Sequence, residues 1–159
     1  MAQIGEKLNN EFNDQVKEEL ESAYIYLAMS AWFAERTLNN LAAWFNKQAE
    51  EEFEHAMKFV NYILETGGSV KYETLKEPKQ DYENILEIVE AAYAHEKYIT
   101  KRIHHLYEVA QDEKELSSFP LLLWFLEEQV EEEDQTAALI DKYKGYRNDF
   151  NFDHHVKRD

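Results

Sequence analysis

Residues 50–55 read EEEFEH, and within this stretch Glu52 and His55 stand three positions apart. On an α-helix, this spacing puts both side chains on one face, where they can close on a single metal ion. The same face continues in both directions with the 3-4-3-4-3 spacing of a buried helical stripe. Its members are Phe45, Gln48, Glu52, His55, Phe59 and Tyr62. We therefore expect a carboxylate and an imidazole where apolar side chains usually lie.

The composition indicates one helical domain. The chain has 159 residues, 44% of them hydrophobic, and only four Gly and two Pro, so long stretches contain no helix breaker. The net charge of −16 argues against a nucleic-acid partner and attracts cations, although a solvated acidic surface would give the same charge. Disulfides, thiolate metal sites and cysteine nucleophiles are excluded because cysteine is absent. Without a signal-like N-terminus or an apolar run of ~18 residues, we expect a cytoplasmic protein with no membrane association.

Four amphipathic segments follow one another, at about 6–36, 39–65, 82–111 and 117–144. We expect Asn39 and Asn40 to supply a turn and an N-cap, Gly67 and Gly68 to end the second helix, and Pro120 to fit the first turn of the fourth. The fold class predicted is all-α, a four-helix bundle over residues 1–145 with a short C-terminal fifth helix or tail over 146–159. At ~3.3 Å per residue, the segment between the second and third helices can cross a bundle ~42 Å long, which would make those two helices parallel.

Each predicted helix places a carboxylate in its buried stripe near the middle of the helix. These carboxylates are Glu19, Glu52, Glu96, and Glu128 with Glu132. Any one of them alone could be a solvated surface residue. Together, buried without partners, they would repel one another and lose hydration, at a cost of several kcal/mol each. Protonation could neutralise some of them, but a bound divalent metal accounts for the whole set more naturally.

An oxygen-rich set of ligands with a single imidazole suits iron(II) or manganese better than calcium or magnesium. Two metals about 3.5–4 Å apart, sharing the central Glu52, would use all of these ligands. Known di-iron bundles draw a Glu from each of two helices and Glu-x-x-His from each of the other two. Here Glu131 stands where the second His is expected, so the second metal would be held by oxygen alone and would exchange more readily.

Three motifs carry a family resemblance. They are QAEEEFEHAM at residues 48–57, YAHE at 93–96 and LWFLEEQVEEE at 123–133. In these motifs the chain resembles the non-haem ferritin family, particularly its bacterial and archaeal branch, and the resemblance runs from about Ile4 to Lys144.

The resemblance implies a ferroxidase centre with two iron sites that share one carboxylate. The first iron would be bound by Glu19, Glu52 and His55. The second would be bound by Glu52, Glu96 and Glu132, with Gln129 close by and Tyr26 next to the centre.

A third iron site is also implied by the resemblance. It would use Glu51, Glu128, Glu131 and Glu132. Trp124 matches a tryptophan near the centre in the family, with core packing as the alternative role.

The resemblance further implies a 24-subunit cage that oxidises iron(II) with O2 or H2O2 and stores a ferric oxide mineral. The chain's partners would then be copies of itself. Family members usually close the fourfold axis with a fifth helix, and residues 146–159 allow only a shortened one. This leaves both the closure of that axis and the stoichiometry of the cage open.

Other functions compete with this interpretation. A peroxide-reducing enzyme of the rubrerythrin type would need a Cys-rich segment and a second Glu-x-x-His, and both are absent. The missing motif also disfavours a haem-containing bacterioferritin. A DNA-protecting mini-ferritin builds its iron site between subunits, whereas one bundle supplies every ligand here. A non-catalytic helical scaffold with incidental carboxylates would bind no metal.

Overall fold

The computed structural model describes residues 3–146 and 148–157, and these residues form helices without any strand. The elements are α1 (Glu6–Ala34), α2 (Asn39–Glu65), α3 (Ile85–Asp112), the 3₁₀-helix η1 (Leu116–Ser118), α4 (Phe119–Gly145) and α5 (Asp149–His155). The predicted all-α four-helix bundle is confirmed, and α5 is the predicted short fifth helix.

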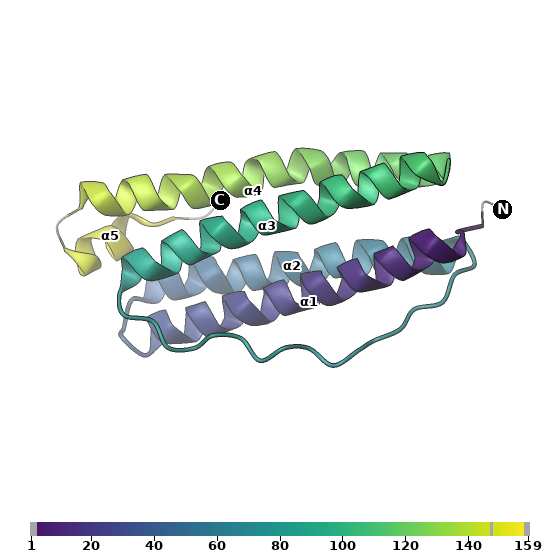
Figure 1. The fold of residues 1–159 in the computed structure, drawn as a ribbon. Helices are drawn as coiled ribbons and strands as arrows, with labels where there is room; N and C mark the ends of the chain where they lie inside the picture. The colour runs from purple at the N-terminus through teal and green to yellow at the C-terminus, as the bar shows by residue number, and fades with distance from the viewer. Residues whose placement is uncertain (1–2, 147, 158–159) are drawn as a thin grey trace.

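The segment between α2 and α3 runs along the whole bundle beside α1, so that α3 starts at the end of the bundle where α2 also starts (Figure 1). Near the N-terminal end of α1, Asn13 accepts a hydrogen bond from the backbone of Lys71 at 2.6 Å and donates one to the carbonyl of Ser69 at 2.8 Å. Near the other end of α1, Trp32 Nε1 donates to the carbonyl of Tyr82 at 3.2 Å. The predicted crossover is therefore confirmed, and it makes α2 and α3 parallel.

Two glycines end α2 for steric reasons. Gly67 has a φ of 76°, in the left-handed region that favours glycine. A Cβ at Gly68 would lie 2.3 Å from Asn9 Oδ1 and 2.7 Å from a methyl group of Ile4. Only glycine lets the crossover start this close to α1.

The start of α2 differs from the prediction. Asn39 and Asn40 lie within the first turn, and Leu38 occupies the N-cap position without a side-chain hydrogen bond. Asp153 of α5 supplies the missing acceptor, because its Oδ1 accepts from the backbone N–H of Leu41 at 2.8 Å. Asn40 donates in turn to the carbonyl of Asp153 at 3.1 Å. The cap comes from the far end of the sequence, so the local pattern could not reveal it.

Helix α5 packs on its own bundle. Its Phe152 is fully buried and Val156 nearly so, in the apolar cluster that also contains Phe33 and Phe45. The ring of Tyr143 at the end of α4 meets Phe152 edge-on at 5.2 Å. The C-terminal helix thus contributes to the core at one end of the bundle.

The apolar core consists of two clusters that lie on either side of a buried polar layer. Helix α4 contributes to both clusters and to the layer through one buried row, Leu122, Phe125, Gln129, Glu132, Thr136 and Leu139. Gln135 is exposed, because it lies one position away from the 3-4 repeat that passes through Thr136.

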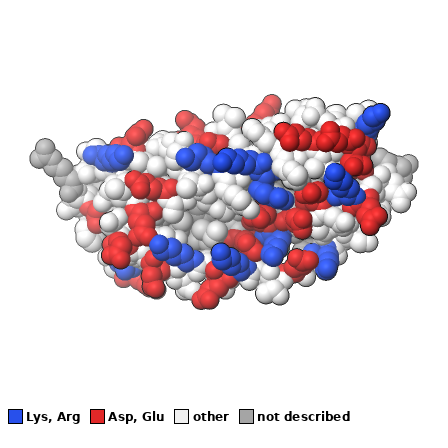
Figure 2. All heavy atoms as spheres, in the orientation of Figure 1, with Lys and Arg blue, Asp and Glu red and all other residues white. Residues whose placement is uncertain are grey.

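The surface carries both signs of charge, and Figure 2 shows acidic and basic side chains interspersed on the face that it draws. None of the helices formed by residues 3–146 and 148–157 combines the length and the apolar character needed to cross a membrane.

Candidate metal centre

The polar layer contains five ionisable groups that all four long helices supply. Glu19 comes from α1, Glu52 and His55 from α2, Glu96 from α3 and Glu132 from α4, and each of these residues is at most 4% exposed. The helical periodicity had predicted this burial, and it is confirmed. Their roles as ligands stay a prediction.

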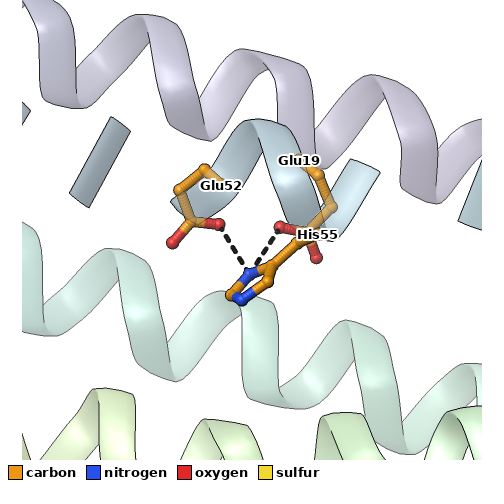
Figure 3. Close-up of side chains that lie close together, drawn as sticks. All are labelled: Glu19, Glu52 and His55. Carbon is orange, nitrogen blue, oxygen red and sulfur yellow. Dashed lines mark ion pairs between the residues drawn. The ribbon is translucent and has the colours of Figure 1, made fainter. Parts of the chain in front are cut away.

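The imidazole of His55 lies between two carboxylates, both of which point toward it (Figure 3). Its Nδ1 is 3.3 Å from Glu52 Oε2 and 3.9 Å from Glu19 Oε2. Neither His55 Nδ1 nor Glu19 Oε2 has a hydrogen-bond partner among the described residues, although both atoms are buried. Buried polar atoms in native proteins are normally paired, so two unpaired atoms that face each other indicate a place for a cation.

Two overlapping sets of potential ligands meet at Glu52. One set is Glu19, Glu52 and His55, and the other is Glu52, Glu96 and Glu132; within each, the potential ligand atoms lie within 4.8 Å of one another. These are the two sets that the family resemblance implies for a pair of iron ions. The geometry fits oxygen and imidazole donors around two cations that share one carboxylate.

Glutamine amides hold several of these carboxylates in place. Gln15 donates to Glu19 Oε1 at 2.9 Å, four residues along α1. Gln48 donates to Glu52 Oε1 at 3.0 Å and also to Glu132 Oε2 at 2.6 Å, which links α2 with α4. These roles of Gln15 and Gln48 were not predicted, although each Gln lies four positions before its Glu, the spacing at which two side chains meet on a helix.

Tyr26 and Gln129 both lie at Glu96. The hydroxyl of Tyr26 donates to Glu96 Oε1 at 2.5 Å, and Gln129 Nε2 donates to Glu96 Oε2 at 3.2 Å. Both side chains are buried. The placement of these two residues beside the centre agrees with what the resemblance implied.

Burial and mutual repulsion make three of the carboxyl groups hard to ionise. Burial, then the charge of Glu52, raises the pKa of Glu96 to about 8. Burial, then the charges of Glu96 and Glu52, raises the pKa of Glu132 to about 9. Burial and the charge of Glu52 also raise the pKa of Glu19 well above its ordinary value. The centre therefore holds protons at neutral pH that a bound cation would displace.

Glu52 and His55 behave differently. Burial alone would raise the pKa of Glu52, but His55, together with Glu19 and Gln48, outweighs it and lowers the pKa. Burial alone would lower the pKa of His55, but Glu52, Glu132 and Glu128 outweigh it and raise the pKa. The carboxylate that both ligand sets share is thus the one most readily kept ionised.

The residues expected for a third iron site are spread over a wider area. Glu128 is half-buried and can share one cation with His55 and Glu132. Glu131 is exposed and lines a cavity of about 240 Å³ together with Trp124, Glu127 and Glu128. Glu51 lies in another cavity, beside Trp44 and Lys142. The structure brings Glu128 to the centre, whereas Glu131 and Glu51 line two separate cavities.

Trp124 packs against the centre. Its ring meets that of His55 edge-on, with the ring centroids 5.6 Å apart. On Trp124, Lys58 Nζ makes a cation–π contact at 4.1 Å from the ring centroid. Trp124 is half-buried, so the role in core packing that the sequence left open agrees with its position.

The ferritin-like domain family matches residues 9–145, a range that contains every residue of the centre. The chain belongs to the ferritin family. Its relatives include a bacterial non-heme ferritin of Campylobacter jejuni, 37% identical over 132 residues that make up 83% of this chain and 79% of that protein. A bacterial non-heme ferritin of Bacteroides fragilis is 34% identical over 141 residues, 89% of each chain. This ferritin is therefore similar to non-haem members of the family. Its membership of the ferritin family supports a role in iron storage.

Solved ferritin structures share the fold. An open pore ferritin from the archaeon Archaeoglobus fulgidus superposes with a TM-score of 0.91 at 34% identity, covering 98% of this chain and 100% of that one. A humanized archaeal ferritin gives a TM-score of 0.91 at 36% identity, covering 94% of this chain and 90% of that one.

Proposed function

We propose that this ferritin oxidises Fe(II) to Fe(III) at a di-iron ferroxidase centre within each subunit and stores the product as a ferric oxyhydroxide mineral. Iron is the substrate and cargo, and O2 or H2O2 is the oxidant. The ligands of the first ion are Glu19, Glu52 and His55, and those of the second are Glu52, Glu96 and Glu132.

One observation carries this proposal. Glu19 Oε2 and His55 Nδ1 are buried, face each other and have no hydrogen-bond partner among the described residues. A structural core would be expected to satisfy both atoms, because an unpaired buried polar group costs about 1–3 kcal/mol. A cation between them and Glu52 would satisfy both at once.

The residues of the centre prepare it for a two-electron reaction. Each of two Fe(II) ions gives up one electron, and the pair of electrons reduces O2 to H2O2 or H2O2 to water. Glu52 contributes to both ligand sets and so fixes the two ions relative to each other. Tyr26 and Gln129 hold Glu96 by hydrogen bonds to its two oxygens, so this ligand is oriented before iron arrives.

The two ions are held with different strength. The first has an imidazole ligand, whereas the second has carboxylates only, two of which are protonated at neutral pH before they bind. We therefore infer that the second ion exchanges more easily. Glu51, Glu128, Glu131 and Glu132 form the third site, through which iron leaves toward the mineral.

The proposed store is a homo-oligomeric cage of 24 subunits. The support is the similarity in fold to solved ferritins over almost the whole chain, including the open pore ferritin of Archaeoglobus fulgidus. Helix α5 is short and packs on its own subunit through Phe152, so the opening at the fourfold axis would be wide.

Substitution of the shared ligand tests the proposed function. Glu52→Ala removes one ligand from both ions, and we expect the initial rate of aerobic Fe(II) oxidation, followed by the ultraviolet absorbance of ferric iron, to fall about tenfold or more. Glu54→Ala is the matched control, because Glu54 is exposed on the same helix and its removal changes the charge equally. Equal rates in the parent and in a folded Glu52→Ala protein would refute the proposed centre.

A further inference from the structure

A chain of hydrogen bonds reaches the centre from the side of α3. Arg102 Nε donates to Gln15 Oε1 at 3.2 Å, and Gln15 Nε2 donates to Glu19 Oε1 at 2.9 Å. Gln15 and Glu19 are fully buried, and Arg102 is half-buried. Arg102 Nη2 is buried without a hydrogen-bond partner among the described residues, so this part of the guanidinium faces the interior.

The arginine decides which end of the Gln15 amide faces Glu19. An amide side chain has one accepting and one donating end, whereas a guanidinium can only donate. With Arg102 at one end, the Gln15 oxygen turns toward Arg102 and its NH2 group toward Glu19. The reversed amide would place its NH2 group against the guanidinium of Arg102, where two donors would face each other.

The fixed amide also decides which oxygen of Glu19 is available. Gln15 engages Oε1, and Oε2 is left as the unpaired atom that lies 3.9 Å from His55 Nδ1. Gln15 is fully buried, so solvent does not compete for its amide. The orientation of Glu19 thus depends on the guanidinium of Arg102, which does not itself touch the site.

We propose that Arg102 is a positioning residue for the first metal ion, acting through Gln15 to hold Glu19 with one oxygen directed at the imidazole of His55. This inference rests on the proposed function, because it assumes that Glu19 and His55 bind an ion. Arg102 is not one of the proposed ligands, and it lies on α3, whereas Glu19, which it orients, lies on α1.

Cobalt(II) binding tests the inference without iron oxidation. Two dissociation constants are measured by equilibrium dialysis and by the visible absorption of bound Co(II). Arg102→Met keeps the aliphatic stem and removes the donor, and we expect it to weaken the first ion about tenfold while the second constant stays unchanged. Arg102→Lys, which retains a donor, should recover part of the loss. Lys101→Met, at the exposed neighbouring position, removes the same charge and should leave both constants as they are.

A double-mutant cycle separates positioning from a general effect of charge. If Arg102 acts through Gln15, Gln15→Leu alone should weaken the first ion, and adding Arg102→Met should weaken it no further. Additive effects, or an equal loss with Lys101→Met, would overturn the inference, as would an unchanged first constant in folded Arg102→Met. If the parent protein itself bound no Co(II), the proposed function would fail first, so the two failures can be distinguished.

Discussion

At the scale of single residues, the two ligand sets differ in how many carboxylate oxygens are free of hydrogen bonds and can bind a cation. Hydrogen bonds from Tyr26 and Gln129 take both oxygens of Glu96, while Gln15 takes only one oxygen of Glu19. In the first ligand set, Glu19 thus has one oxygen free for a cation. In the second set, Glu96 must break or share its hydrogen bonds with Tyr26 and Gln129 when it binds one. This difference supports an order of binding in which the first ion precedes the second.

The raised pKa values make the stability of the metal-free protein depend on pH. Glu96 and Glu132 titrate at about 8 and about 9 in the folded state, well above the ordinary value of 4.5. Between these limits the folded state binds more protons than the unfolded state, so stability falls as pH rises. We predict that the denaturation midpoint of the metal-free protein decreases from pH 7 to pH 9.

Two variants check the source of that slope. Glu132→Gln keeps the shape but cannot ionise, so it should flatten the dependence, and Glu90→Gln at an exposed position of α3 should not. A parent protein whose midpoint stayed constant or rose between pH 7 and pH 9 would contradict the protonated state of the centre.

Sequence periodicity could predict the positions of the centre's ligands but not their hydrogen bonds. Glu19, Glu52 and Glu96 fall on helical stripes, and stripes are set by backbone geometry alone. The contact between Arg102 and Gln15 depends on the rotamers of two long side chains from different helices, which no spacing encodes.

At the scale of elements, the C-terminal helix α5 matters because it completes α2, the helix that carries Glu52 and His55. Asp153 of α5 accepts from the Leu41 amide, one of the free N–H groups at the start of α2. The short α5 is itself capped by Asn148, whose side chain accepts from Phe150 and Asn151. At the start of α2, Asn40 donates in return to the carbonyl of Asp153, so each of the two helices stabilises an end of the other.

Removal of this cap has a measurable cost. We predict that Asp153→Ala lowers the free energy of unfolding of the metal-free protein by about 1 kcal/mol, the usual value for an N-cap. Hydrogen exchange at the Leu41 amide should accelerate in the same variant. Asp141→Ala, at an exposed position on α4, is the control. If the Asp153 variant matched the control in both measurements, α5 would not cap α2.

The helices and the crossover could be predicted because they depend on local periodicity, glycine stops and chain length. The start of α2 could not, since its acceptor comes from a residue more than a hundred positions away.

At the scale of the whole molecule, charge and fold agree with the handling of iron. The net charge of −16 attracts cations from solution. Added salt screens this attraction and weakens it. One bundle holds both proposed ligand sets, so under the proposed function each subunit would oxidise iron independently. Storage requires in addition that the subunits enclose a space.

Sedimentation of the native particle before and after aerobic loading with Fe(II) tests the central claim most directly. We predict a single large species with the mass of a 24-subunit cage, which sediments faster after loading at an unchanged outer diameter because the mineral lies inside. The Glu52→Ala particle should assemble equally and gain iron more slowly. A monomer or dimer, or a particle that gains no mass while ferric iron precipitates in the surrounding solution, would contradict the account.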